Sequence, residues 1–108
     1  MQPIAELRLS GVRHDGQVVL IVAAVGHPYQ GKGRWCCPVS LTGIDDRSVD
    51  VGGEDSMQAL CLGLRLVGLR LADFVTKGGR LFNEGEPHEP DSEFPLEAYF
   101  CRGDLPPA

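Results

Sequence analysis

Residues 52–79 constrain the fold of this chain most, because they have the pattern of one long amphipathic helix. After a Gly-Gly pair come Asp55 and Ser56, whose side-chain oxygens can accept hydrogen bonds from the free amides of a first helical turn. Lys77 places a cation at the negative end of the helix dipole, and a second Gly-Gly pair follows it. About six turns of helix fit between the two glycine pairs.

The large apolar side chains of this helix gather on one face when residues are placed about 100° apart. We expect this face to contact a sheet; it comprises Met57, Leu60, Cys61, Leu64, Val67, Gly68, Leu71, Phe74 and Val75. The polar face carries Arg65 and Asp73, but also Leu62, Leu66 and Leu69, which are neighbours at helical spacing. Burying each leucine would contribute about 1.5–3 kcal/mol, so we expect a cover for them. It is either the chain's own C-terminal segment or a second protein chain.

Short β-strands are predicted before and after the helix. Residues 4–9 alternate apolar and charged side chains, which is typical of a half-buried strand. Residues 18–25 are a continuous apolar run rich in valine, which predicts a central strand covered on both faces. Further strands are expected at residues 34–41, with Pro38 at an edge or bulge, at 47–51 and at 80–82, while 26–33 reads as a loop.

This order of elements predicts an α+β fold. We expect an antiparallel meander of four or five strands packed against one long helix, in the order β-β-β-β-α-(β). A chain of 108 residues is expected to form a single domain, 1–108. Its core would span residues 4–84. Residues 85–108 contain an acidic, proline-rich loop and an apolar C-terminal segment, 94–101, which could dock on the sheet or over the three leucines.

Charge and composition exclude some classes of partner. The formal net charge of −5 disfavours nucleic acid and anionic membranes, because both attract basic surfaces. The N-terminus lacks the pattern of a secretion signal, no stretch of about 20 residues is apolar enough to span a bilayer, and the four cysteines look like reduced thiols. We therefore expect a cytoplasmic protein.

No catalytic or metal-binding pattern is present. The histidines at 14, 27 and 88 are far apart, and no Cys-x-x-Cys pair exists. Cys36 or Cys37 with His27 is a conceivable thiol site, but nothing in the sequence selects it. We predict no enzyme, no metal and no cofactor, with a small thiol-dependent enzyme as the remote alternative. Trp35 is more typical of a core or sheet residue than of an interface anchor.

Three short motifs resemble a small family of uncharacterised bacterial domains. They are Leu7-Arg8-Leu9-Ser10-Gly11, Trp35-Cys36-Cys37-Pro38, and Gly53-Glu54-Asp55-Ser56-Met57-Gln58-Ala59-Leu60. The resemblance covers roughly residues 4–84, and the motif that opens the helix is its most specific part. It implies no activity and no site residues. In size, charge and lack of catalytic groups, such domains are similar to bacterial immunity proteins.

These observations predict a non-catalytic protein-binding domain. The most plausible form is an immunity protein that blocks a basic toxin by steric occlusion; the alternative is a homodimeric structural or adaptor protein. Acidic residues that would steer it toward a basic cleft are Asp45, Asp46, Glu84, Glu86, Glu89 and Asp91. The candidate partner-binding residues are Leu62, Leu66, Leu69, Arg65, Asp73, Asp45, Asp46 and Trp35.

Overall fold

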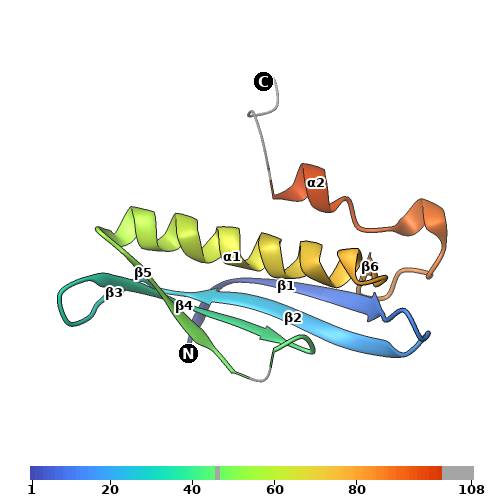
Figure 1. The fold of residues 1–108 in the computed structure, drawn as a ribbon, viewed down its shortest axis with the longest axis horizontal. Helices are drawn as coiled ribbons and strands as arrows, with labels where there is room; N and C mark the ends of the chain where they lie inside the picture. The colour runs from blue at the N-terminus through green and yellow to red at the C-terminus, as the bar shows by residue number, and fades with distance from the viewer. Residues whose placement is uncertain (46, 101–108) are drawn as a thin grey trace.

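The computed structural model describes residues 1–45 and 47–100, except for the side chain of residue 99. They form two layers, in which one long helix lies across one face of an antiparallel sheet (Figure 1). The strands are β1 (Pro3–Val12), β2 (Val18–Gly26), β3 (Tyr29–Gln30), β4 (Trp35–Thr42), β5 (Val49–Gly53) and β6 (Arg80–Asn83). The helices are α1 (Ser56–Thr76), a 3-10 turn at Pro90–Ser92 and α2 (Leu96–Tyr99). The predicted α+β class is confirmed.

Strands β1, β2, β4 and β5 form the predicted antiparallel meander, and β6 pairs with the far side of β1. The central strand β4 pairs with β2 through its second half and with β5 through its first half. Both ladders meet at Val39, which lies opposite Val25 and Val49. Pro38 comes one residue before the β2 ladder begins, so its missing amide proton removes no bond to β2.

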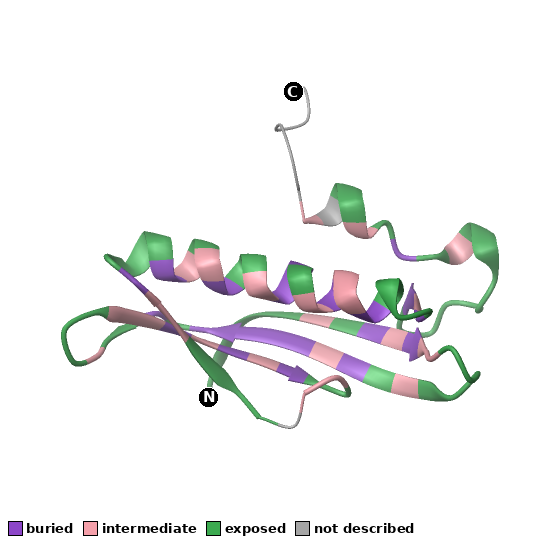
Figure 2. Cartoon of the chain, viewed as in Figure 1, coloured by how far each residue is buried: buried purple, intermediate pink, exposed green. Residues whose placement is uncertain are grey.

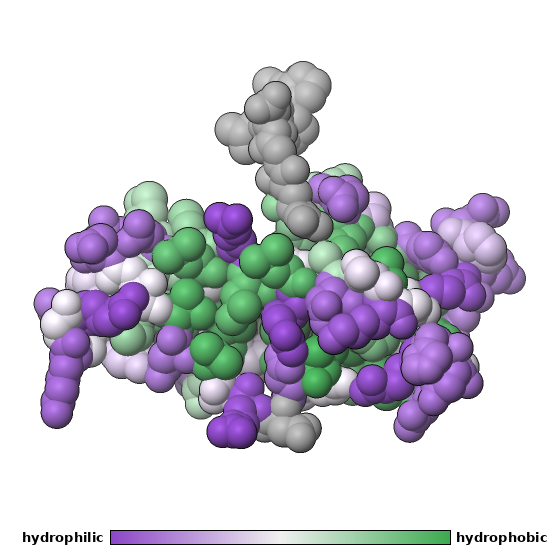
Figure 3. All heavy atoms as spheres, viewed as in Figure 1, coloured by the Kyte–Doolittle hydropathy of each residue, from purple (hydrophilic) through white to green (hydrophobic). Residues whose placement is uncertain are grey.

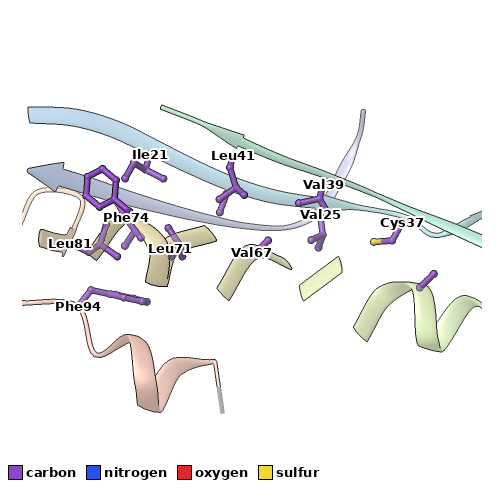
Figure 4. Close-up of a cluster of buried hydrophobic side chains, with 13 residues drawn as sticks. Ile21, Val25, Cys37, Val39, Leu41, Val67, Leu71, Phe74, Leu81 and Phe94 are labelled. Atoms are coloured by element: carbon purple, nitrogen blue, oxygen red, sulfur yellow. The ribbon is translucent and has the colours of Figure 1, made fainter. Parts of the chain in front are cut away.

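The core lies between the sheet and α1. Alternate strand side chains point toward the helix, as the twofold period of a strand requires. Figure 4 shows these side chains facing the buried side of α1. The strands contribute Leu9, Ile21, Ala23, Val25, Cys37, Val39, Leu41 and Leu81, and α1 contributes Ala59, Val67, Leu71 and Phe74.

Both ends of α1 have the predicted capping groups. The Asp55 carboxylate accepts a hydrogen bond from the Gln58 amide over 2.8 Å. At the C-terminus the amides of Gly78 and Gly79 donate to carbonyl oxygens of the last turn, each over 3.0 Å. Gly78 has a φ of +94°, the left-handed conformation that only glycine adopts readily. The helix therefore stops where the sequence predicts.

The buried face of α1 is rotated from the predicted one. Met57 is 74% exposed and Leu64 is 40% exposed, and Cys61 and Val75 are also exposed, so their predicted core positions are wrong. Figure 2 shows that buried positions of α1 face the sheet while its outer side is exposed. The small residues Ala59 and Gly63 are buried instead. A Cβ on Gly63 would lie 2.9 Å from the Cys37 sulfur, so the close approach of α1 to β4 selects small side chains there.

The first half of strand β2 is covered on one face only. Leu20 is 47% exposed and Val18 is also exposed, on the sheet face away from α1. The prediction that this strand is covered on both faces is therefore wrong for its first half. The valine-rich run reflects a strand whose outer face is partly apolar, a pattern that periodicity alone cannot separate from a fully buried strand.

Several element boundaries also differ from the prediction. The fourth long strand is β5 at 49–53 rather than 47–51, so the first Gly-Gly pair lies in the sheet. The predicted loop at 26–33 contains the two-residue strand β3. The fifth predicted strand, 80–82, is present as β6.

The acidic loop after β6 folds back on the outer face of the sheet. Glu84 pairs with Arg8 at 3.0 Å, and Glu93 pairs with Arg80 at 2.7 Å. Phe82 is fully buried beneath this loop, with its ring centre 4.8 Å from that of His88. Part of the segment predicted as acidic loop and tail therefore belongs to the folded domain.

Candidate functional site

The three leucines predicted on the polar face of α1 differ in exposure. Leu69 is 45% exposed, whereas Leu62 and Leu66 are half-buried. Leu66 packs against the edge of the core. The prediction that all three lie in the middle of a polar arc is therefore wrong, because the rotated buried face brings Leu66 close to the sheet. The three leucines therefore form a partly buried apolar flank of the helix, not a fully exposed row of side chains.

This flank continues onto β5 and the preceding loop. Val49 is 48% exposed and Val51 and Ile44 are half-buried, and Ile44 and Val49 line the same hollow as Leu66. Figure 3 shows hydrophobic side chains gathered over the middle of α1 and the adjoining part of β5. We call this region the α1–β5 surface and define it by Ile44, Val49, Val51, Leu62, Leu66 and Leu69.

The described part of the C-terminal segment lies on the opposite flank of α1. Phe94 is buried in the core, and the Phe100 ring lies against Gly68. Phe100 also lines a small apolar groove with Leu7 and Leu64. The segment therefore covers a different side of the helix from the α1–β5 surface. The predicted docking segment also included Cys101, which lies outside the described residues.

Charged side chains border the α1–β5 surface. Arg70 forms a two-pronged ion pair with Asp45, in which Nε donates to one carboxylate oxygen over 3.1 Å and Nη2 donates to the other. The hydrogen bond to Asp45 raises the pKa of Arg70. Arg47 is exposed on the same side. Asp46, predicted to contact a partner, lies outside the described residues.

The other two predicted charged residues lie on α1 itself. Lys77 pairs with Asp73 at 2.8 Å, one turn along the helix, and the hydrogen bond from Lys77 lowers the pKa of Asp73. Arg65 is exposed on the outer side of the helix, three residues after Leu62 and four residues before Leu69. Both residues therefore lie beside the α1–β5 surface, and their contact with a partner stays a prediction.

A second hollow, which we call the basic hollow, adjoins this border at the C-terminal end of α1. It has a volume of about 330 Å³ and is lined by Arg13, His14, Arg70, Asp73 and Lys77, together with Ile44, Phe74 and Gly79. The Arg13 guanidinium donates to the Gly43 carbonyl oxygen over 3.1 Å and lies 6.0 Å from the centre of the Phe74 ring. Ile44 and Arg70 line both hollows, so the two adjoin.

Trp35 does not belong to this surface. It begins β4, faces α1 and packs at the margin of the core, opposite Gly53. This position supports the predicted role of Trp35 as a core or sheet residue. The steering residues Glu84, Glu86, Glu89 and Asp91 lie in the loop on the other face of the sheet, away from the α1–β5 surface.

The structure places one cysteine of the conceivable thiol site, Cys37, in a setting that disfavours reactivity. Cys37 is buried beneath α1, and burial raises the pKa of its thiol, which disfavours a thiolate nucleophile. The His27 ring contacts the Pro28 carbonyl oxygen at 2.7 Å. In the described chain no three His, Cys, Asp or Glu side chains are placed to hold a metal ion. None of the described helices is long and apolar enough to cross a membrane.

Several contributors to the site were not predicted, among them Ile44, Val49, Val51 and Arg13. Val49 and Val51 share one face of β5 by the alternation of a strand, so the sequence contained a signal for a paired apolar stripe. Nothing local indicates that Arg13, from the β1–β2 turn, meets the end of α1. That contact depends on how the helix crosses the sheet.

Comparison with known proteins identifies a family but no relative with a described activity. A comparison with curated proteins gives no match, and neither does a comparison with solved structures. The family model for a domain of unknown function, DUF6968, matches residues 6–95. The match runs from β1 to the end of the loop that folds over the sheet, and so includes α1, β5 and the α1–β5 surface. The chain therefore belongs to the DUF6968 family of domains of unknown function.

Proposed function

We propose that this chain is a non-catalytic protein-binding domain that docks on another protein through the α1–β5 surface. The observation that carries the proposal is a continuous apolar region built from two elements and bordered by charged side chains. A large side chain from a partner fits between Leu66, Ile44 and Val49, where the hollow is open. Apolar surface with a charged rim is the usual composition of a protein interface.

Neutralisation of a bacterial toxin in the cytoplasm is the specific form of this function that we propose. An immunity protein needs a binding surface and no catalytic groups, because it acts by covering the active site of the toxin. Gene context tests this form: production of the chain together with a toxin encoded beside it should protect a sensitive cell. Loss of protection on Leu69→Asp would link protection to the α1–β5 surface.

The docking surface is tested by a matched pair of variants. Leu69→Asp places a charge on the α1–β5 surface, and Leu64→Asp places one at a leucine of similar exposure on the opposite flank of α1. The tagged full chain is isolated from its native host, and the affinity of any stoichiometric partner is measured for each variant. We expect Leu69→Asp to weaken binding at least about tenfold and Leu64→Asp to leave it within about twofold.

Two results would contradict this docking surface. One is equal loss of affinity in both variants, and the other is loss only in Leu64→Asp, which would place the partner over the groove beside Phe100. A homodimer is a further outcome, because the same apolar surface could pair with a second copy. Sedimentation velocity identifies it: the wild-type chain would sediment as a dimer and Leu69→Asp as a monomer.

A further inference from the structure

The charges beside the α1–β5 surface are mostly positive, although the chain as a whole carries −5. Among the described residues, the charged side chains that line the two adjoining hollows are Arg13, Arg47, Arg70 and Lys77 against Asp45 and Asp73. His14 also lines the basic hollow. The net acidity of the chain comes from elsewhere, including the loop on the other face of the sheet.

The two carboxylates leave hydrogen-bond donors available. Arg70 uses Nε and Nη2 for Asp45, and Arg13 uses one N–H group for the Gly43 carbonyl oxygen. A guanidinium has five N–H donors, so both side chains can bind a further acceptor. Within the described chain no carboxylate pairs with Arg47. These cations are therefore only partly neutralised by their own protein.

We propose that the partner of the α1–β5 surface is a protein segment in which apolar side chains are followed by carboxylates. The inference rests on the proposed function and adds the chemistry of the partner. The apolar side chains contact Leu66, Leu69 and Val49, and the Asp or Glu side chains enter the basic hollow to bind Arg13, Arg70 and Lys77. A basic partner, which the net charge alone suggested, would bring cations against these residues and is disfavoured at this surface.

The chain's own acidic loop is a poor occupant in a second copy. Residues 84–93 supply carboxylates such as Glu86 and Glu89, but they include no large apolar side chain to fill the hollow at Leu66. A two-fold dimer would also place the cations of one copy near those of the other. The charge and shape of the site together therefore favour a different protein that carries both features.

The test is a selection of random peptides displayed on phage against the immobilised full chain. We expect the enriched peptides to combine Leu, Ile or Phe with Asp or Glu and to be depleted of Lys and Arg. A synthetic peptide of the enriched sequence should bind the wild-type chain at least about tenfold more tightly than Leu69→Asp. Its affinity should fall as salt rises from about 0.05 to about 0.3 M, because exposed ion pairs are screened.

Charge reversal gives the decisive comparison. Arg47→Glu with Lys77→Glu reverses two exposed cations at the site, and Lys32→Glu with Arg34→Glu reverses two exposed cations of the β3–β4 loop, which line neither hollow. Both double variants change the net charge equally. We expect the first to weaken binding of the acidic peptide about tenfold or more and the second to change it less than about threefold. Thermal unfolding checks that both variants are folded.

The possible outcomes separate the two proposals. Peptides that depend on Leu69 but are basic or uncharged would overturn the acidic partner and leave the docking surface in place. Equal effects of the two double variants would also overturn it, because binding would then follow net charge alone. A selection that enriches no Leu69-dependent peptide would overturn the docking surface and the inference together. Self-association that is lost in Leu69→Asp would replace the acidic partner by a second copy.

Discussion

At the scale of single residues, the position of α1 depends on a glycine. Gly63 lies directly over Cys37 and Val39 of β4, so α1 approaches the sheet more closely there than any side chain would permit. A Cβ would lie 2.9 Å from the Cys37 sulfur and 3.2 Å from a Val39 methyl group. This contact sets the rotation of the helix, which in turn brings Leu66 to the edge of the core and leaves Leu69 exposed.

Gly63→Ala should therefore destabilise the fold although alanine is the better helix former. We expect a loss of about 1–3 kcal/mol in the free energy of unfolding from overpacking, offset by about 1 kcal/mol of helix propensity. Gly68→Ala is the matched control, because its new methyl group would lie 3.4 Å from the Phe100 ring, an ordinary contact. It should be neutral or stabilise by up to about 1 kcal/mol. Urea unfolding of both variants measures the difference, and a stable Gly63→Ala would contradict the close approach.

The same residues show what the sequence could predict. The amphipathic pattern correctly located α1 and its ends, because caps and glycines act locally. It misplaced the buried face, since the pattern gives weight to Met57 and Leu64 as large apolar residues and none to Gly63. Contact between a helix and a strand depends on side-chain volume on both elements, and Cys37 is 26 residues away from Gly63 in the chain. The residue pattern of the helix alone could therefore not predict which of its faces contacts the sheet.

At the scale of elements, α1 is defined by its caps. Asp55 supplies one side-chain acceptor to the first turn, and Gln58 returns one by accepting from the Glu54 amide over 2.7 Å. Asp55→Ala should lower the free energy of unfolding by about 1 kcal/mol. Ser56→Ala, one residue inside the helix, should change it by less than about 0.5 kcal/mol. Equal effects in chemical denaturation would assign the cap to a different residue.

The loop after β6 is held to the sheet by ion pairs, and one of them, Arg8–Glu84, weakens in acid. The hydrogen bond from Arg8 lowers the pKa of Glu84 below its ordinary value of about 4.5. Because the folded-state pKa is lower than the unfolded one, this pair stabilises the fold above about pH 4.5, and the contribution disappears as the pH falls through the folded pKa. Glu84→Gln should therefore flatten the decline of stability below that pH, measured by unfolding from pH 7 to about pH 3. Glu86→Gln, with no ion pair among the described residues, should retain the wild-type slope.

At the scale of the whole molecule, the chain separates its charges by face. The outer face of the sheet carries the acidic loop with its arginine partners, whereas cations border the apolar surface beside α1. The sequence predicted the order of elements and the antiparallel meander. It could not predict that Arg13, Arg47 and Arg70 converge on this side, because they come from three segments that only the fold brings together. The net charge of the whole chain therefore does not give the sign of the charges beside this surface.

We propose above that the α1–β5 surface, rather than any other apolar region, contacts a partner. Methyl-labelled NMR of the full chain with the partner isolated from its host tests it most directly, since each leucine and valine reports separately. We expect the partner to change the methyl chemical shifts of Leu62, Leu66, Leu69 and Val49. The methyl chemical shifts of Leu64, Val18 and Leu20 should stay unchanged. Shifts centred on Leu64 beside Phe100, or on Val18 and Leu20 of the outer sheet face, would contradict it.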